Sequence, residues 1–192
     1  MSSPLPNPRR LRVSNHVEGM AAAHQTEPGV NVLVDTLDPV PVRPQMNRAL
    51  IAAHTAIPTS NSEDDGPKPD AIPGSGIVVP GGANIYYLDL APHSESPMHR
   101  TPSTDYVIVL NGELTVATPP AAFDVVDGRG SYGKVEETVA RAGDVVIQRG
   151  CMHALANRTG DWVRLIGIVL GAEPVKVEVA GEKRELGEAW LQ

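Results

Sequence analysis

The stretch Met98-His99-Arg100-Thr101-Pro102-Ser103-Thr104-Asp105-Tyr106-Val107-Ile108-Val109-Leu110-Asn111-Gly112 decides the fold. A second stretch has the same pattern of residue types: Gly143-Asp144-Val145-Val146-Ile147-Gln148-Arg149-Gly150-Cys151-Met152-His153-Ala154-Leu155-Ala156-Asn157. Each stretch joins an apolar, β-branched run to a glycine turn and carries a His, an Arg or a carboxylate at its edge, which is typical of strands bounded by turns. The pair predicts a small β-barrel that holds polar side chains in an apolar pocket.

The composition favours many short strands around one core. The chain has 192 residues, of which 41% are hydrophobic and only 4% aromatic, with 18 Gly and 18 Pro. That length suits one domain with a tail. We predict an N-terminal arm and loop over residues 1–76, with one or two strands packing on the barrel or on a partner. The barrel follows over residues 77–175, and a C-terminal strand or helix tail over residues 176–192.

Charge and cysteine content indicate which kinds of binding partner and which cellular compartment to expect. The net charge of -7 provides no basic surface for nucleic acid or for an anionic membrane. No apolar run has membrane-spanning length, and the first residues lack the apolar core of a signal peptide. The single cysteine, Cys151, excludes an intramolecular disulfide and agrees with a reducing compartment. We therefore expect a cytoplasmic protein with no nucleic-acid or membrane partner.

Local patterns outside the two stretches are less decisive. Residues 45–56 fit either a short helix or a strand, residues 57–76 read as a solvated loop, and residues 182–191 suggest a short terminal helix. The long connection over residues 117–134 fits either a lid over a pocket or a tolerated surface insertion.

Two predicted strands are apolar on both faces, over residues 106–110 and, apart from Arg164, over residues 163–170. A barrel wall exposed to water would alternate apolar with polar residues. The outer face must then be covered by the N-terminal segment or by another subunit, which predicts a homodimer.

The two stretches resemble the paired motifs of the cupin family, Gly…His-x-His…Glu…Gly and Gly…Pro-x-Gly-x-x-His-x-x-x-Asn. The residues that fit are Gly112, Gly143, Gly150, His153 and Asn157, while Asp105 stands in the place of the Glu. The Met-His-Arg-Thr motif is similar to the motif of a branch of small single-domain cupins that are common beside secondary-metabolite genes. This resemblance implies an all-β fold, a double-stranded β-helix or cupin jelly-roll barrel with an N-terminal arm.

The chain departs from the first motif at its histidines. The two alternating His positions fall on Met98 and Arg100, with His99 between them. Because side chains alternate across a strand, His99 faces the barrel only if the register shifts or the strand bulges. The second motif has Gln148 where Pro is usual.

The candidate catalytic residues are His99, Arg100, Asp105 and His153. Arg100 has the planar fork that fits a carboxylate or enolate, and the histidines titrate near neutral pH. Burial of Asp105 at the start of an apolar strand would raise its pKa unless a cation lies near, but it could instead cap the turn at residues 103–104. The candidate substrate-binding residues are Met98, Val107, Val109, Asn157 and Arg164.

A metal is an open alternative at the same place. His99, Asp105 and His153 form a two-His, one-carboxylate set of the kind that suits non-haem iron. The cofactor is therefore either absent or a single divalent metal such as Fe, Zn, Mn or Ni.

The resemblance and these residues together predict an enzyme of small-molecule metabolism. We expect a lyase or isomerase that decarboxylates, dehydrates or cyclises a small organic acid or polyketide-like molecule by acid–base chemistry. The alternatives are a metal-dependent oxygenase and a non-catalytic small-molecule binding or sensing module.

Overall fold

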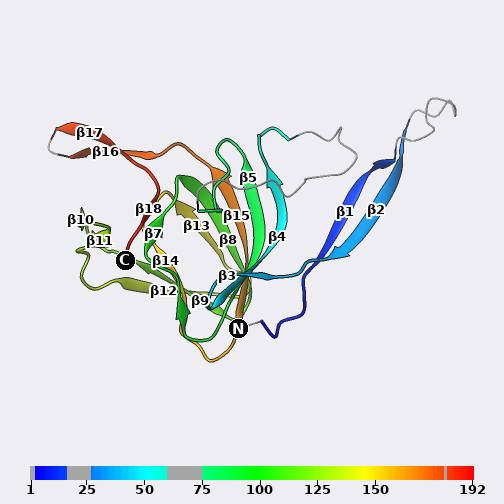
Figure 1. Cartoon of the computed structure of the whole chain (residues 1–192), viewed down its shortest axis with the longest axis horizontal. Coiled ribbons are helices and arrows are strands. Elements are labelled where there is room, and N and C mark those ends of the chain that lie inside the picture. The colour runs from blue at the N-terminus through cyan, green and yellow to red at the C-terminus, as the bar shows by residue number, and fades with distance from the viewer. Residues whose placement is uncertain (1–2, 17–26, 60–74, 180) are drawn as a thin grey trace.

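A computed structural model of the chain describes residues 3–16, 27–59, 75–179 and 181–192. Every regular element in these residues is a β-strand, and no helix in them is long and apolar enough to cross a membrane. Figure 1 shows the strands gathered into a barrel from which two hairpins project.

Two antiparallel sheets form the barrel. The six-stranded sheet has the order β13-β8-β15-β5-β4-β3, with bounds β3 Val40–Arg43, β4 Met46–His54, β5 Ala83–Leu90, β8 Ser103–Asn111, β13 Val145–Arg149 and β15 Val163–Gly171. The four-stranded sheet has the order β12-β9-β14-β6, with bounds β6 Ser94–Glu95, β9 Glu113–Thr118, β12 Glu136–Arg141 and β14 Ala154–Asn157. This arrangement confirms the expected double-stranded β-helix.

Four two-stranded ribbons complete the described chain. They are β1 Arg9–His16 with β2 Gly29–Thr36, β10 Val125–Val126 with β11 Arg129–Gly130, β16 Val175–Val179 with β17 Glu182–Leu186, and β7 His99–Arg100 with β18 Ala189–Trp190. The β1–β2 and β16–β17 ribbons stand away from the barrel (Figure 1). The β7–β18 ribbon brings the end of the chain back to the first motif.

The core lies between the two sheets because their strands alternate. Along β8, the side chains of Ser103, Asp105, Val107 and Val109 are buried, whereas Tyr106 and Leu110 are exposed. The inward residues meet buried side chains from the other sheet in one cluster, which contains Met46, Leu90, Val107, Val109, Leu114, Val116, Ala140, Leu155, Val163 and Leu165. Burial of about ten apolar side chains is the main stabilising contribution to the barrel.

One glycine in the first motif is required by its turn. Gly112 joins β8 to β9 at a φ of 80°, and a Cβ atom there would lie 3.0 Å from the Trp162 carbonyl oxygen. Only glycine adopts such a backbone without cost. The motif glycine therefore fixes the turn that connects the two sheets.

Several local expectations are now decided. Residues 45–56, which the sequence left open, contain strand β4. The terminal helix expected over residues 182–191 is wrong, because that segment forms β17 and β18, paired with β16 and β7. Most of the loop expected over residues 57–76 lies outside the described residues.

The connection over residues 117–134 packs beside the barrel. Its Phe123 and Tyr132 contact edge to face and lie against a second apolar cluster, which contains Met98, Ala117, Met152, Ala154 and Leu191. No residue of this connection after Ala117 belongs to the walls of the barrel cavity described below. The connection therefore packs on an apolar cluster that is formed mainly by residues of the barrel and of the C-terminal segment.

Candidate functional site

The barrel holds a cavity with two connected parts. The outer chamber has a volume of about 290 Å³ and is lined by Val42, Arg43, Met46, Arg48, Ser75, Ile77, Tyr86, Leu88, Ser96, His99, Leu155 and Trp190. The inner pocket has a volume of about 30 Å³ and is lined by Ile77, Tyr86, Leu88, His99, Thr101, Asp105, Val107, Gln148, His153, Leu155, Leu165, Gly167 and Val169. Five residues line both parts, so the inner pocket lies directly behind the outer chamber.

Two histidines lie side by side at the junction. His99 on β7 and His153, just before β14, form an isolated antiparallel bridge, with backbone N–H···O distances of 2.8 and 2.9 Å. Their ring centroids are 4.3 Å apart. The register at residues 98–100 thus places His99 in the cavity, where the alternation of the cupin motif would have placed Met98 and Arg100.

Hydrogen bonds to backbone carbonyls fix the tautomer of both imidazole rings. His99 Nδ1 lies 2.8 Å from the Pro97 oxygen, and His153 Nδ1 lies 3.0 Å from the Cys151 oxygen. In a neutral ring Nδ1 donates this bond, which leaves Nε2 as the acceptor. Burial lowers the pKa of His99, and burial together with the nearby His99 lowers the pKa of His153 to about 4. At pH 7 both rings are neutral hydrogen-bond acceptors, whereas the sequence suggested titration near neutral pH.

Asp105 is the ionisable acid of the inner pocket. Its side chain is 7% exposed, and burial raises its pKa to about 6 despite a hydrogen bond with Ser103. Its Oδ1 atom has no hydrogen-bond partner among the described residues. Burial, and then the charge of Asp105, raise the pKa of Tyr86 to about 12, so that phenol stays protonated and can donate.

Trp190 closes one side of the outer chamber. Its ring stacks on His99 with centroids 4.3 Å apart and an interplanar angle of 6°, and the Arg43 guanidinium lies 5.0 Å from the Trp190 ring centroid. Arg48 lies over Tyr86 and donates to the Gly76 oxygen at 2.6 Å. The chamber is therefore largely apolar, with two cations at its rim.

The structure does not bring Arg100 to the cavity. As the strand neighbour of His99, it points to the opposite side, where its Nε donates to the Gly187 oxygen at 2.9 Å. Among the expected substrate contacts, only Val107 lines the inner pocket, while Val109 lies in the main core and Met98 in the second cluster.

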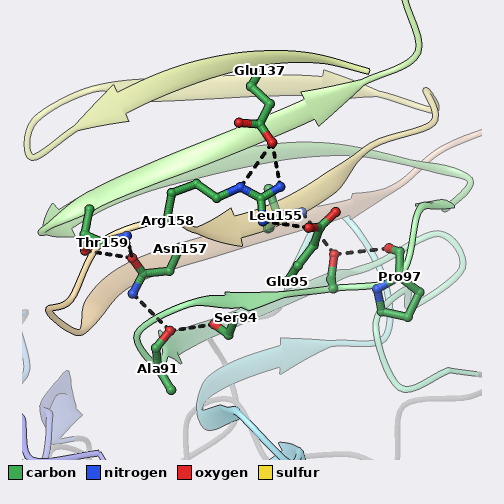
Figure 2. Close-up of polar contacts among 10 residues, drawn as sticks. Ala91, Ser94, Glu95, Pro97, Glu137, Leu155, Asn157, Arg158 and Thr159 are labelled. Atoms are coloured by element: carbon green, nitrogen blue, oxygen red, sulfur yellow. Dashed lines mark hydrogen bonds and ion pairs between the residues drawn. The ribbon is translucent and has the colours of Figure 1, made fainter. Parts of the chain in front are cut away.

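Asn157 and Arg164 also lie away from the cavity. The Asn157 side chain donates to the oxygens of Leu90, Ala91 and Asp161 and accepts from Thr159 N and Oγ1. Figure 2 shows it fixing the turn after β14, next to the Arg158 ion pairs with Glu95 and Glu137. Arg164 forms a two-bond ion pair with Asp89, at 2.6 and 2.7 Å, on the outer face of the sheet. Both residues have structural roles.

The expected metal set is not assembled. No group of three or more His, Cys, Asp or Glu side chains in the described part of the chain is placed to hold a metal ion. His99, His153 and Asp105 all line the inner pocket, but they are not placed as one ligand group, and Asp105 interacts with Tyr86 and Ser103. The residues present therefore do not fit a three-ligand centre.

Three site residues escaped the sequence analysis. Tyr86 and Trp190 reach the cavity only through the pairing of β5 with β15 and of β18 with β7, and no local pattern reports such pairings. Gln148 is paired directly opposite Asp105, and its Nε2 atom is also without a partner among the described residues. Its one signal was its position, where the motif usually has Pro.

Comparison with known proteins finds sequence similarity to cupin-domain proteins and to proteins of fungal biosynthesis clusters. No protein-family model matches the chain. It is 36% identical over 104 residues to phomopsin biosynthesis cluster protein D of Diaporthe leptostromiformis, covering 54% of this chain and 48% of that protein. It is 33% identical over 113 residues to a cupin-domain-containing oxidoreductase of Aspergillus ruber, covering 57% and 48%. The chain has the cupin fold and is similar in sequence to both proteins.

This cupin-fold chain spans about half the length of the curated relatives that it matches. A crystal structure of an uncharacterized conserved protein with a double-stranded β-helix domain from Klebsiella pneumoniae gives a TM-score of 0.45 at 15% identity. The match covers 80% of this chain and 90% of that one. Likeness at this level carries no information on the reaction.

Proposed function

We propose that this cupin-fold chain is an enzyme that moves a proton on a small carbonyl compound, as an isomerase or a lyase. The observation that carries the proposal is the buried Asp105 carboxyl, whose Oδ1 has no hydrogen-bond partner among the described residues, in the inner pocket beside the protonated Tyr86 phenol and two neutral histidines. A general base works best when its pKa lies near the operating pH, and the environment of Asp105 favours that range.

The proposed step uses residues of this chain alone. The Asp105 carboxylate removes a proton from the carbon next to the substrate carbonyl: the C–H bond breaks, an O–H bond forms on Asp105, and the electron pair moves to the carbonyl oxygen. The Tyr86 hydroxyl donates to the oxyanion that forms. Return of the proton to another carbon completes an isomerisation, and loss of a leaving group, such as water, completes an elimination.

The apolar walls support this chemistry. Leu88 and Leu155 line both parts of the cavity, and Leu165 and Val169 line the inner pocket. In such a water-poor site an ionised carboxylate is poorly solvated and its basicity rises. The neutral rings of His99 and His153 can accept hydrogen bonds from substrate hydroxyl groups at Nε2.

Proton exchange tests the proposal without a known substrate. Acetophenone and 1-indanone are incubated with the protein in deuterated buffer, and loss of the α-proton signal is followed by NMR. We expect exchange above the buffer rate that increases as pH rises through about 6, and a loss of about 10²-fold or more in Asp105→Asn. Glu178→Gln, at an exposed carboxylate on β16, is the control. Exchange that is equal in all three proteins and in buffer would overturn the proposal.

An oxidoreductase is the second candidate, because relatives such as the Aspergillus ruber protein are named as such. The free Nε2 atoms of His99 and His153 are compatible with two of the ligands that such an enzyme would need. Metal analysis of the purified protein, followed by the same analysis of a His99→Ala, His153→Ala variant, decides this point. A stoichiometric first-row metal lost from the double variant would favour the oxidoreductase, and binding of ketones without exchange or metal would favour a binding module.

We also propose that the partner of the chain is a second copy. The arm β1–β2 exposes Leu11, Val13, Val30, Val32, Leu33 and Val34, and the outer face of the six-stranded sheet exposes Tyr106, Leu110, Val145 and Ile147. The arm does not cover that face in one chain (Figure 1). Two apolar surfaces on one chain fit a reciprocal dimer, with each arm on the other copy's sheet. Light scattering should give a mass near 41 kDa for the dimer, against 20.4 kDa for one chain. The double variant Val145→Lys, Ile147→Lys places two charges on this face and should give the monomer mass.

A further inference from the structure

The inner pocket contains two buried polar atoms that the chain itself does not satisfy. They are Asp105 Oδ1, an acceptor when the group is ionised, and Gln148 Nε2, a donor. The two side chains are 7% and 5% exposed, and both line the inner pocket. A buried polar group without a partner costs stability, so a paired occurrence in one pocket points to a ligand that supplies both missing bonds.

The backbone fixes the spacing of these two atoms. Asp105 on β8 and Gln148 on β13 are directly opposed residues of an antiparallel pair, and their side chains point to the same face of the sheet. Directly opposed residues have Cβ atoms roughly 5 Å apart. A head group placed between them can meet a donor on one side and an acceptor on the other.

From this pair we propose that Gln148 orients the substrate by donating its Nε2–H to the substrate carbonyl oxygen, while the hydrogen on the adjacent atom faces Asp105. The ligand class is a small carbonyl compound with a hydrogen-bearing atom next to the carbonyl and an apolar, ring-sized body. In the reacting compound that atom is the carbon that loses its proton, so the inference rests on the proposed function for the reaction, although not for binding.

The shape of the cavity agrees with this orientation. About 30 Å³ has room for a small head group and not for a ring. The outer chamber of about 290 Å³ has room for a ring-sized body beside Trp190 and Leu88. A carbonyl compound would therefore enter head first, with its body against the apolar wall.

Benzamide and acetophenone form a matched pair of probes for this inference. Both have a carbonyl on a phenyl ring, but benzamide has an amide N–H where acetophenone has its reacting methyl C–H. At pH 8, where Asp105 is ionised, the carboxylate accepts the amide N–H. We expect the wild-type protein to bind benzamide about tenfold more tightly than acetophenone in an NMR titration, which is the effect of one added hydrogen bond to a charged group.

Two variants separate the contribution of the Gln148 donor to binding from that of the Asp105 acceptor. Gln148→Met keeps the side-chain volume and removes the donor, so the affinity for both probes should fall by about fivefold to tenfold, with their ratio retained. Asp105→Leu removes the acceptor, so the benzamide preference should disappear. Each substitution removes an unsatisfied buried polar atom, so neither is expected to lower the melting temperature. Gln148→Glu, which replaces the donor with an acceptor of the same shape, is the second variant if Gln148→Met does not fold.

The inference is overturned if Gln148→Met and Gln148→Glu bind both probes as the wild type and Glu178→Gln do, or if benzamide has no advantage at pH 8. Its failure is distinct from failure of the proposed function. Exchange that depends on Asp105, with unchanged probe binding in the Gln148 variants, would refute only the orienting role. The expected binding pattern without any proton exchange would refute only the reaction.

Discussion

The burial of Asp105 makes a prediction about stability that needs no substrate. The perturbation is Asp105→Asn, which keeps the shape of the side chain and removes its charge. The carboxyl has a pKa of about 6 in the folded chain, against an ordinary value of 3.8. At 1.36 kcal/mol for each pH unit, the ionised carboxylate destabilises the fold by about 3 kcal/mol.

The sign follows from proton binding. Between pH 3.8 and 6 the folded chain holds the Asp105 proton more tightly than the unfolded chain does. The contribution of this group to the free energy of unfolding is therefore undiminished at low pH, falls as pH rises through that window, and stays low above it. The Asp105→Asn variant lacks this loss. The difference in free energy of unfolding between the variant and the wild type should therefore favour the variant by up to about 3 kcal/mol more at pH 7.5 than at pH 4.

The assay is urea unfolding of both proteins at pH 4.0 and pH 7.5, followed by circular dichroism. Because the two proteins share every other titrating group, including His153 with its lowered pKa, the difference between them isolates Asp105. Glu178→Gln, at an exposed carboxylate on β16, is the matched control. If the advantage of Asp105→Asn were the same at both pH values, the carboxyl would not be desolvated as the structure indicates.

Three further predictions concern the frame of the site, each measured by urea unfolding. Asn157→Ala removes three donated and two accepted hydrogen bonds of a buried side chain and should cost about 3 kcal/mol or more; a cost below about 1 kcal/mol would contradict this role. Arg164→Met leaves Asp89, whose side chain is 2% exposed, without its partner and should cost about 3–5 kcal/mol, most of it recovered in the double variant with Asp89→Leu. Gly112→Ala forces a side chain onto a φ of 80° against the Trp162 oxygen and should cost about 1–3 kcal/mol, whereas an unchanged midpoint would show that the turn relaxes.

The local patterns predicted the barrel but only part of its cavity. The apolar run over residues 106–110 and the glycine at position 112 are short-range signals of a strand and its turn, although the run is apolar on both faces and did not show which side chains of β8 face inward. The place of His153 in the pocket was implied by the resemblance of the second stretch to the cupin motif. These features depend on a strand and a turn, which neighbouring residues encode.

The remainder of the site depends on contacts between distant segments. Arg100 was expected in the cavity, but the two-residue strand β7 pairs with β18 and so gives the inward position to His99. Tyr86, Gln148 and Trp190 reach the site through sheet pairings whose register no local pattern reports. The expected three-ligand metal set depends on long-range placement in the same way, and its three side chains line one pocket without forming a ligand group among the described residues.

The position of Trp190 on the ribbon β7–β18 has a practical consequence. The residue that forms one cavity wall belongs to a terminal ribbon and not to the two barrel sheets. Substitution of Trp190 can thus change which small molecule the outer chamber accepts without altering a residue of either barrel sheet.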